Sequence, residues 1–268
     1  MVLTTKVKYW QTMRGKFLSY WGRRRPRHKR QRFGARLTRV LRWSWRLLLV
    51  LLVLDFFYLL TVWPNWHHFG QGRALRSQFI LSYQQQRKQD PALPPLRWTP
   101  VAGSELPHDL RRAVVIGEDA RFYHHHGIDL LAFWDAMDTN LELGKFKYGG
   151  STISQQTIKN LYFSSARNPL RKWHELILTL AMEMHISKRR ILSTYLNIAE
   201  FGEGIYGAEA AAEYYWHIPA RQLSERQAAE LAASLPSPKQ NNPQTRTHYF
   251  LQRADRIYAW MLKQDREN

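Results

Sequence analysis

The stretch LRKWHELILTLAMEM, residues 170–184, indicates the fold class of this chain. Its apolar residues recur at intervals of three, four and seven positions, which places them on one face of an α-helix. We expect one buried seam of Leu170, Ile177, Ala181 and Met184, and a second of Ala228, Leu231, Ala232 and Leu235. No convincing run of the alternating pattern typical of strands follows Pro107. The sequence therefore predicts a mainly α domain of about 160 residues.

The positive charge of the chain is concentrated at its N-terminus. The 268 residues contain 40 Lys and Arg against 21 Asp and Glu, a formal charge of +19. Residues 1–46 carry 15 of these basic residues and no acidic one, so the rest of the chain has 25 basic and 21 acidic residues. A strongly basic chain favours polyanionic partners such as nucleic acid, anionic lipid or phosphate-bearing substrates. The absence of cysteine excludes disulfides, zinc-finger sites and thiol nucleophiles.

An apolar segment follows the basic tail. Residues 47–63 read LLLVLLVLDFFYLLTVW, and an extension back to Leu41 brings the helix to the ~30 Å of a bilayer core. Tryptophans flank the segment on both sides, and Pro64 should end the helix. A buried core helix or a cleaved signal peptide fits less well, because the basic flank is long and no small-residue cleavage site follows. Since basic flanks stay in the cytoplasm, we expect the chain past Trp66 to be exported.

Asp55 is the single charged residue of this segment. A carboxyl group near the bilayer centre costs about 2.5–3.5 kcal/mol on insertion scales, which the surrounding apolar residues outweigh. Two explanations are open: the side chain is protonated, or it faces a partner helix.

The first candidate motif for chemistry is EDARFYHHHGID, residues 118–129, which follows an apolar run. A carboxylate at the end of a buried helix loses solvation, so its pKa rises and it becomes a proton acceptor near neutral pH. The alternative is an ordinary solvated helix end. The consecutive residues His124, His125 and His126 suggest a metal site, but neighbouring side chains on a helix point in different directions, which disfavours zinc.

The second motif is GGSTISQQ, residues 149–156, with Lys159 and Asn160 one turn later. Two glycines and Ser-Thr predict a tight turn and an N-cap, which leaves backbone N–H groups and the positive helix end available to an anion. An ordinary capped helix is the alternative. The density of short hydrogen-bonding side chains favours a binding site.

Two further motifs follow. The third motif consists of Arg167 and RKWHE, residues 171–175. Arg171 and Glu175 could make an ordinary surface ion pair, or Glu175 could be a carboxylate placed among cations that bind a diphosphate. In KRRILSTYLNIAEFGEGIYGAEAAA, residues 188–212, the glycines should end one helix and start another.

Taken in this order, the four motifs resemble the peptidoglycan glycosyltransferase family, the domain that polymerises lipid II in class A penicillin-binding proteins and monofunctional transglycosylases. The resemblance runs from about Val101 to Pro243 and rests on ED-x2-F-x2-H-x-G, GGST-I-[ST]-QQ, RK-x2-E and K-x2-IL-x2-YLN. The run Asn197–Gly202 is similar to the monofunctional subgroup, and no transpeptidase signature occurs beyond Pro243.

The resemblance implies a lysozyme-like helical domain with a small membrane-associated lobe, preceded by one transmembrane helix. The lobe should include the apolar run 130–134. We expect a cytoplasmic tail (1–46), the transmembrane helix (47–66), a linker (67–100), the glycosyltransferase domain (101–245) and a C-terminal helix (246–268). The protein should sit in the bacterial inner membrane with its catalytic domain in the periplasm.

The resemblance also implies the reaction. Glu118 would be the general base on the 4-hydroxyl of the GlcNAc of lipid II. Glu175 would assist at the departing diphosphate, alone or with Mg²⁺ or Mn²⁺. Asp119 and Asn197 would serve mainly the architecture of the site. The residues that position diphosphate and sugars would be Ser151, Thr152, Gln155, Gln156, Lys159, Arg167, Arg171 and Lys172. Partners would be lipid II, nascent glycan strands, the membrane and other proteins of cell-wall synthesis, but not nucleic acid.

Three departures from the family pattern stand out. Ser154 replaces a more usual Thr, and Trp216 and Ile218 stand where Phe and Lys are common. Residues 236–241 lack a frequent basic-aromatic pair, for which Lys239 is a candidate substitute.

Three other functions compete with this interpretation. A lysozyme-like hydrolase or lytic transglycosylase would also use two carboxylates, but it has little need of the cations around Glu175. A scaffold without catalysis would not need Glu118 and Glu175. A nucleic-acid binder would need its basic residues on the folded domain rather than in the tail.

Overall fold

The computed structural model describes residues 27–70, 76–145, 149–163 and 169–267, with side chains from residue 38 onward. The chain divides into two units, residues 1–62 and 63–268. In the first unit, α2 (Arg27–Val62) contains the 25-residue segment Thr38–Val62, which is long and apolar enough to cross a membrane. The predicted apolar helix is therefore present. It ends two residues before Pro64, where the missing N–H group prevents a further turn.

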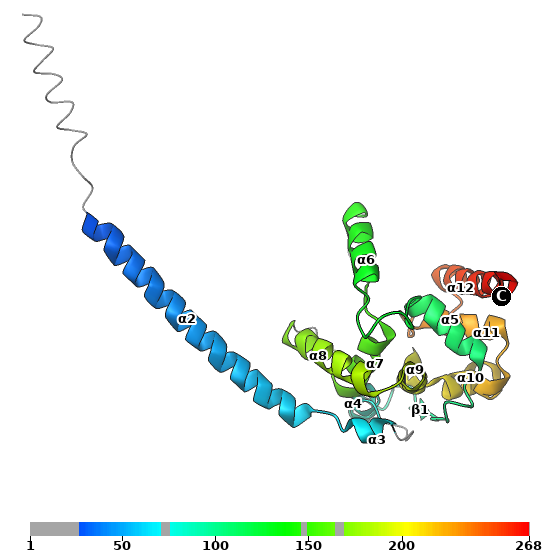
Figure 1. Ribbon diagram of the computed structural model, residues 1–268. Coiled ribbons are helices and arrows are strands. Elements are labelled where there is room, and N and C mark those ends of the chain that lie inside the picture. The colour runs from blue at the N-terminus through cyan, green and yellow to red at the C-terminus, as the bar shows by residue number, and fades with distance from the viewer. Residues whose placement is uncertain (1–26, 71–75, 146–148, 164–168, 268) are drawn as a thin grey trace, which may run out of the picture. The chain divides into compact units, whose positions relative to one another are not determined.

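The second unit is built mainly of helices (Figure 1). The mainly α fold that the sequence predicts is confirmed, although the boundaries predicted at residues 100 and 245 stay predictions. The helices are α3 (Trp66–Gly70), α4 (Gln78–Gln89), α5 (His108–Glu118), α6 (Leu130–Glu142), α7 (Ile153–Tyr162), α8 (Pro169–His185), α9 (Lys188–Ile198), α10 (Ala208–Trp216), α11 (Glu225–Ser234) and α12 (His248–Glu267), with a 3-10 turn at Ala220–Gln222.

A small sheet that the sequence did not predict joins two distant parts of this unit. Its strands are β1 (Arg97–Trp98), β2 (Glu200–Gly202) and β3 (Ile205–Tyr206), in the order β1-β3-β2. β1 pairs in parallel with β3, and β2 pairs antiparallel with β3. Strands of two or three residues are too short to show an alternating pattern. The glycine-rich run between α9 and α10, interpreted only as a break between helices, thus also forms a hairpin.

The seam predicted for α8 is largely wrong. Leu170 is 56% and Met184 82% exposed, and of the four predicted residues only Ala181 is fully buried. The buried face instead contains polar side chains, among them Glu175 and Thr179. These polar groups have partners inside the protein, and Thr179 Oγ1, for example, donates to the Glu175 carbonyl oxygen at 2.7 Å. The apolar face of α8 that remains exposed consists of Leu170, Trp173, Leu180 and Met184.

The second predicted seam is confirmed and lies at the centre of the unit. Ala228, Leu231 and Ala232 of α11 are fully buried, and Leu235 packs against the core. α11 packs against both α5 and α12, while α7 packs against α8 and α9. These two groups of helices carry the four motifs of the sequence, and Gln156 of α7 and Glu118 of α5 meet between them.

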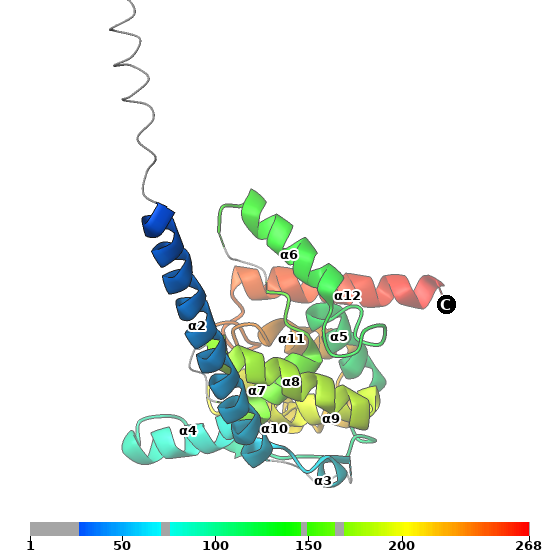
Figure 2. The same ribbon diagram turned by 60° about the vertical axis from the view of Figure 1, so that its left-hand side comes forward.

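α6 projects away from the other helices of this unit in Figure 1, whereas in the view of Figure 2 one of its ends overlaps α12. Asp129 caps its N-terminus by accepting a hydrogen bond from the Ala132 N–H group at 2.9 Å. The apolar side chains Leu130, Leu131 and Trp134 are each more than half exposed. An exposed apolar surface of this kind is typical of a protein or membrane contact.

Candidate active site

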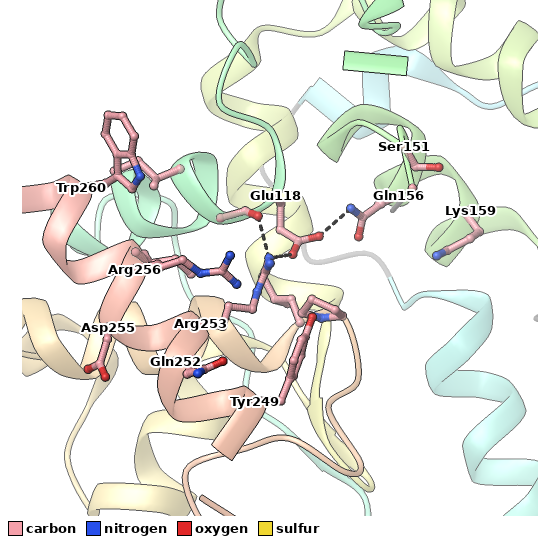
Figure 3. Close-up of a pocket in the computed structure, with 16 residues that line it drawn as sticks. Glu118, Ser151, Gln156, Lys159, Tyr249, Gln252, Arg253, Asp255, Arg256 and Trp260 are labelled. Atoms are coloured by element: carbon pink, nitrogen blue, oxygen red, sulfur yellow. Dashed lines mark hydrogen bonds and ion pairs between the residues drawn. The ribbon is translucent and has the colours of Figure 1, made fainter. Parts of the chain in front are cut away.

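Three distant segments meet at Glu118, the last residue of α5. Its carboxylate is only 9% exposed. Oε2 accepts a hydrogen bond from Gln156 Nε2 of α7 at 2.9 Å, and Oε1 accepts one from Arg253 Nη2 of α12 at 2.8 Å (Figure 3). A carboxylate offers about four acceptor positions, and these two donors occupy two of them. Glu118 is therefore held in place while it keeps the capacity to accept a proton.

Burial raises the pKa of Glu118, and this is the largest effect on it. The positive charges of Arg253 and Lys159 and the hydrogen bond from Gln156 act in the opposite direction without cancelling it. An ordinary glutamate has a pKa of about 4.3. A raised pKa makes Glu118 a better match for general base catalysis near neutral pH.

A hydrogen-bond chain fixes the orientation of Gln156. The Tyr195 hydroxyl donates to Gln156 Oε1 at 2.8 Å. Burial raises the pKa of Tyr195, so the phenol keeps its proton and remains a donor. Since Oε1 is already an acceptor, the amide Nε2 is directed at Glu118. Tyr195, on α9, thereby acts on the carboxylate through Gln156.

Asp119, adjacent to Glu118, serves the fold. Its carboxylate accepts hydrogen bonds from His125 Nε2 and from the Ile153 N–H group, both at 3.0 Å. Ile153 is the first residue of α7, where a carboxylate is favoured by the helix dipole. The contact ties the end of α5 to the start of α7. It therefore sets the position of Glu118 relative to Gln156.

Asp119, His125 and Asp129 have potential metal-ligand atoms within 4.8 Å of one another. All three are already engaged in the fold. His125 Nδ1 accepts a hydrogen bond from the Gly127 N–H group at 3.1 Å, and Asp129 pairs with Arg121 besides capping α6. This donor set fits a structural network better than a metal centre. His124 and His126 are exposed, and the three histidines lie in a turn rather than on the helix that the prediction assumed.

The GGST motif divides between the cavity and the fold. Thr152 and Gln155 form a capping box at the start of α7, and the Thr152 hydroxyl donates to the Gly127 carbonyl oxygen at 2.6 Å. Both residues are buried. Ser151 is exposed and lines a cavity together with Gln156. The structure thus places two of the predicted substrate-binding residues in the helix cap and two at the cavity.

Gly150 explains why this motif needs a glycine before Ser-Thr. A Cβ atom at Gly150 would lie 2.8 Å from the Cα atom of Phe133 in α6. Because Gly150 has no side chain, the loop passes directly against α6. Its neighbours Gly149 and Ser151, which line the cavity, therefore lie next to that helix.

Lys159 lines the same cavity one turn further along α7. Burial is the main cause that lowers its pKa, and the positive charges of Arg171 and Lys172 lower it further. The negative charges of Glu175 and Glu118 oppose this effect. Lys159 therefore lies close enough to Glu175 and Glu118 for their negative charges to act on its pKa.

Glu175 lies among cations on α8. Its side chain is 2% exposed, and Oε1 accepts from Lys172 Nζ at 2.5 Å while Arg171 Nη1 lies 3.8 Å from Oε2. Lys172 is half exposed. The predicted residues Lys159, Arg171, Lys172 and Glu175 thus form one electrostatic group, to which we refer as the cation cluster. Arg167 lies outside the described residues.

The cation cluster does not fit a divalent ion held by the protein. Mg²⁺ and Mn²⁺ favour several oxygen ligands, usually carboxylates. Within residues 149–163 and 169–185, the cluster offers the single carboxylate of Glu175, which already contacts two cations.

Asn197 connects α9 to the segment before α5. Its amide nitrogen donates to the carbonyl oxygens of Val101 and Ser193, and its oxygen accepts from the Val101 N–H group at 2.8 Å. All polar atoms of the side chain are therefore used within the fold. This agrees with the expectation that Asn197 serves mainly architecture.

The cavity at Glu118 has a volume of about 990 Å³, and α12 forms one of its walls. Figure 3 shows Arg253 between α12 and Glu118, with Lys159 on the opposite side of the carboxylate from Trp260. The sequence reasoning missed this wall, because α12 was assigned to a separate C-terminal helix. The sequence nevertheless contained a signal. Arg253 lies three residues after Phe250 and four before Ile257, so on a helix its side chain shares the face of these two buried residues. The cavity residues from α12 are Tyr249, Gln252, Arg253, Asp255, Arg256, Ile257 and Trp260.

The departures from the family pattern have structural explanations. Ser154 keeps the hydroxyl, which donates to Glu183. Trp216 and Ile218 pack against the core. Lys239 pairs with Glu203 at 3.3 Å and does not line the cavity, so α12 rather than Lys239 provides the basic groups there.

Known proteins are similar to this chain over more than half of its length. The profile of the Transglycosylase family matches residues 94–262. A protein of Nitrosospira multiformis named biosynthetic peptidoglycan transglycosylase is 40% identical over 201 residues, which cover 74% of this chain and 86% of the relative. A protein of the same name from Janthinobacterium sp. is 40% identical over 80% of this chain and 90% of the relative. A third, from Alcanivorax borkumensis, is 51% identical over 57% of this chain and 62% of the relative. The chain therefore belongs to the transglycosylase family.

Proposed function

We propose that this chain polymerises the glycan strands of peptidoglycan. It transfers a growing glycan, linked to undecaprenyl diphosphate, to the GlcNAc 4-hydroxyl of lipid II and releases undecaprenyl diphosphate. The observation that carries this proposal is a buried carboxylate, Glu118, in one cavity with Lys159, through which the cation cluster approaches it. Arg171, Lys172 and Glu175 do not themselves line that cavity. The relatives named biosynthetic peptidoglycan transglycosylase support the same reaction.

In this reaction Glu118 acts as the general base. It accepts the proton of the 4-hydroxyl while the oxygen forms a bond to C1 of the donor sugar. Attack from the face opposite the leaving group inverts the anomeric centre. Arg253 and Gln156 hold the carboxylate during proton transfer, and the raised pKa of Glu118 favours that transfer.

The cation cluster acts at the leaving group. As the bond between C1 and the diphosphate oxygen breaks, the electron pair remains on the diphosphate. Lys159, Arg171 and Lys172 oppose the negative charge that develops there. Glu175 holds two of these cations in place. Because Glu175 is already paired with two cations, Mg²⁺ or Mn²⁺ at this step would be held by the diphosphate rather than by the cation cluster.

A membrane location suits a lipid-linked substrate. We propose that α2 anchors the chain in the bacterial inner membrane, with the basic tail in the cytoplasm and residues 63–268 in the periplasm. The exposed apolar residues of α6 and α8 then face the bilayer, where they bring the cavity close to the lipid carrier. Other proteins of cell-wall synthesis are further expected partners.

A glycan hydrolase is the main alternative. Such an enzyme also needs a protonatable carboxylate, but its substrate is an uncharged glycosidic bond. The cation cluster would then have no anion to bind. The structure therefore favours a transferase that acts on a diphosphate.

The test uses the full chain in detergent with fluorescent lipid II, and resolves the products by gel electrophoresis. We expect a ladder of glycan polymers that muramidase digests. Glu118→Gln should abolish the ladder and leave lipid II binding nearly unchanged, since the amide keeps the shape but cannot take the proton. Glu213→Gln, at an exposed site on α10, is the matched control and should stay active. A chain that shortens sacculi without extending lipid II, or a Glu118→Gln variant with near-normal turnover, would overturn the proposal.

A further inference from the structure

A second cavity of about 810 Å³ lies along α5, between α12 and the start of α9. Ile116 of α5 and Trp260 of α12 line both this cavity and the one at Glu118. The two cavities are therefore neighbours, with these two side chains at their common border. Figure 3 shows Trp260 on the side of Glu118 that is remote from Lys159. We refer to the second space as the α5–α12 cavity.

The α5–α12 cavity is lined by cations. Arg112 pairs with Asp265, with Nη2 2.8 Å from Oδ2, and Arg111 Nη2 donates to the Leu106 carbonyl oxygen at 2.6 Å. In the described part of the chain, the buried Nε atoms of Arg111 and Arg112 have no hydrogen-bond partner. Because these Nε atoms are closed to solvent, the two arginines contribute positive charge to the cavity rather than accessible Nε donors.

Arg189 adds a third positive charge to the same cavity. It is exposed near the start of α9, and among the described residues its side chain makes no ion pair or hydrogen bond. The lining of this cavity contains these three arginines and, among the described residues, no acidic side chain, although Asp265, Asp109 and Glu225 lie near Arg112. The lining itself therefore has an excess of positive charge. An anionic ligand with several acceptor atoms fits this arrangement.

Aromatic rings lie beside these cations. Trp260 is 55% and Tyr123 58% exposed, and both line the α5–α12 cavity. Lys263 Nζ lies 5.0 Å from the centre of the Trp260 ring. Exposed aromatic side chains combine an apolar surface with a polar tip, which suits contact with the apolar face of a sugar ring or with peptide groups.

The distance from the reactive group also limits the ligand. Glu118 and Arg112 are six residues apart on α5, a rise of about 9 Å at ~1.5 Å per residue. This is close to the length of a disaccharide. A ligand whose sugar contacts Glu118 can therefore place an attached acidic group among the arginines of the α5–α12 cavity.

We infer that the α5–α12 cavity binds the carboxylate-bearing peptide of the glycan substrate whose sugar is held at Glu118. This inference rests on the proposed function, because the substrate of that reaction is a glycopeptide with free carboxylates. A lipid phosphate is a less suitable occupant, since the cation cluster that fits the diphosphate lies beyond Glu118 on the side of Lys159. The peptide subsite thus lies on the opposite side of the base from the diphosphate.

A binding experiment tests this without catalysis. A fluorescent disaccharide-peptide without lipid or diphosphate is titrated with the full chain in detergent, and anisotropy is recorded. A second probe has its peptide carboxylates converted to amides. Arg189→Gln should weaken binding of the acidic probe about tenfold, because one charge-assisted hydrogen bond is lost. The same variant should bind the amide probe as tightly as the wild type does. Arg221→Gln, an equal change of charge at an exposed site of the 3-10 turn, should affect neither probe.

Polymerisation gives a second measurement. When the peptide carboxylates of lipid II are free, Arg189→Gln should raise KM about tenfold and leave kcat unchanged. When these carboxylates are converted to amides, the substitution should change neither KM nor kcat. Equal effects on both probes, or no effect on either, would overturn the inference, as would displacement of the acidic probe by phosphatidylglycerol vesicles. A wild-type chain that binds the acidic probe through Arg189 but makes no polymer would instead contradict the proposed function.

Discussion

Arg253 Nη2 lies 2.8 Å from Glu118 Oε1, and the same nitrogen donates to the Gly117 carbonyl oxygen at 2.6 Å. The guanidinium group is thus fixed by the backbone of α5 as well as by the carboxylate. Its positive charge lowers the pKa of Glu118, whereas burial raises it by more. The basicity of Glu118 therefore depends on a residue of the last helix.

Removal of that charge should shift the pH dependence of the reaction. Arg253→Gln leaves burial as the dominant effect, so the pKa of Glu118 rises further. We expect the acid limb of kcat/KM for lipid II to move to higher pH, with a lower rate at neutral pH. Arg256→Gln is the control, because Arg256 lines the same cavity without contact to Glu118. An acid limb that moves equally in both variants, or in neither, would contradict this role.

Lys159 should set the alkaline limit of activity. Its pKa is lowered by burial and by Arg171 and Lys172, so it loses its charge at a lower pH than an ordinary lysine, for which the pKa is about 10.4. Lys159→Arg keeps a charge to above pH ~12 and should extend activity to higher pH, whereas Lys159→Met should be impaired at every pH. The pH profile of lipid II polymerisation measures this. Lys239→Arg, a change outside the cavity, is the control and should leave the alkaline limb of the pH profile unchanged. If Lys159→Arg also had the alkaline limb of the wild type, Lys159 would not set the alkaline limit.

The buried base should reduce stability as pH rises. Because the folded-state pKa of Glu118 lies above the unfolded value, the folded state binds this proton more tightly, and that stabilisation is lost as pH rises through the folded pKa. Glu118→Gln removes the effect. We expect the Tm of this variant, relative to wild type, to increase as the pH rises above about 4.3, the pKa of an ordinary glutamate. Differential scanning calorimetry of the full chain in detergent measures it, with Glu213→Gln as control. A Tm difference that is independent of pH would refute the prediction.

The ion pair between Lys188 and Glu183 should be important for folding. Lys188 Nζ lies 2.7 Å from Glu183 Oε1, and the carboxylate is only 4% exposed. Lys188→Met leaves a buried carboxylate without its cation, which should lower the free energy of unfolding by about 3–5 kcal/mol. Lys263→Met, in an exposed pair with Glu267, should lower it by less than about 1 kcal/mol. Denaturant unfolding compares the two, and similar losses would show that burial of the pair has little effect.

The sequence predicted the helices that carry the site better than it predicted which faces they bury. In α11 the seven consecutive residues 228–234 are all buried, so an apolar seam predicted anywhere along this stretch lies in the core. In α8 apolar residues occur on several faces, and the buried one is selected by partners for its polar groups, such as Lys172 for Glu175. Such partners cannot be read from the spacing of apolar residues.

Local patterns also could not reveal contacts between distant segments. The capping box of Thr152 and Gln155 is a local feature, and the N-cap was predicted, although the same residues were also assigned to substrate. The pairing of β1 with β3 joins residues more than 100 positions apart, in strands too short for a periodic signal. The contact of Arg253 with Glu118 spans 135 positions, so only the folded structure shows that α12 belongs to the cavity.

This long separation imposes an order of events on the newly made protein. α12 follows every other described element in the chain, so Glu118, the GGST turn and Glu175 are all synthesised before Arg253. A nascent molecule thus contains both acidic residues while the wall that restrains its base is still missing. Chains that terminate before residue 253 would share this defect. A growing chain therefore acquires the cation that restrains Glu118 only once α12 has been made.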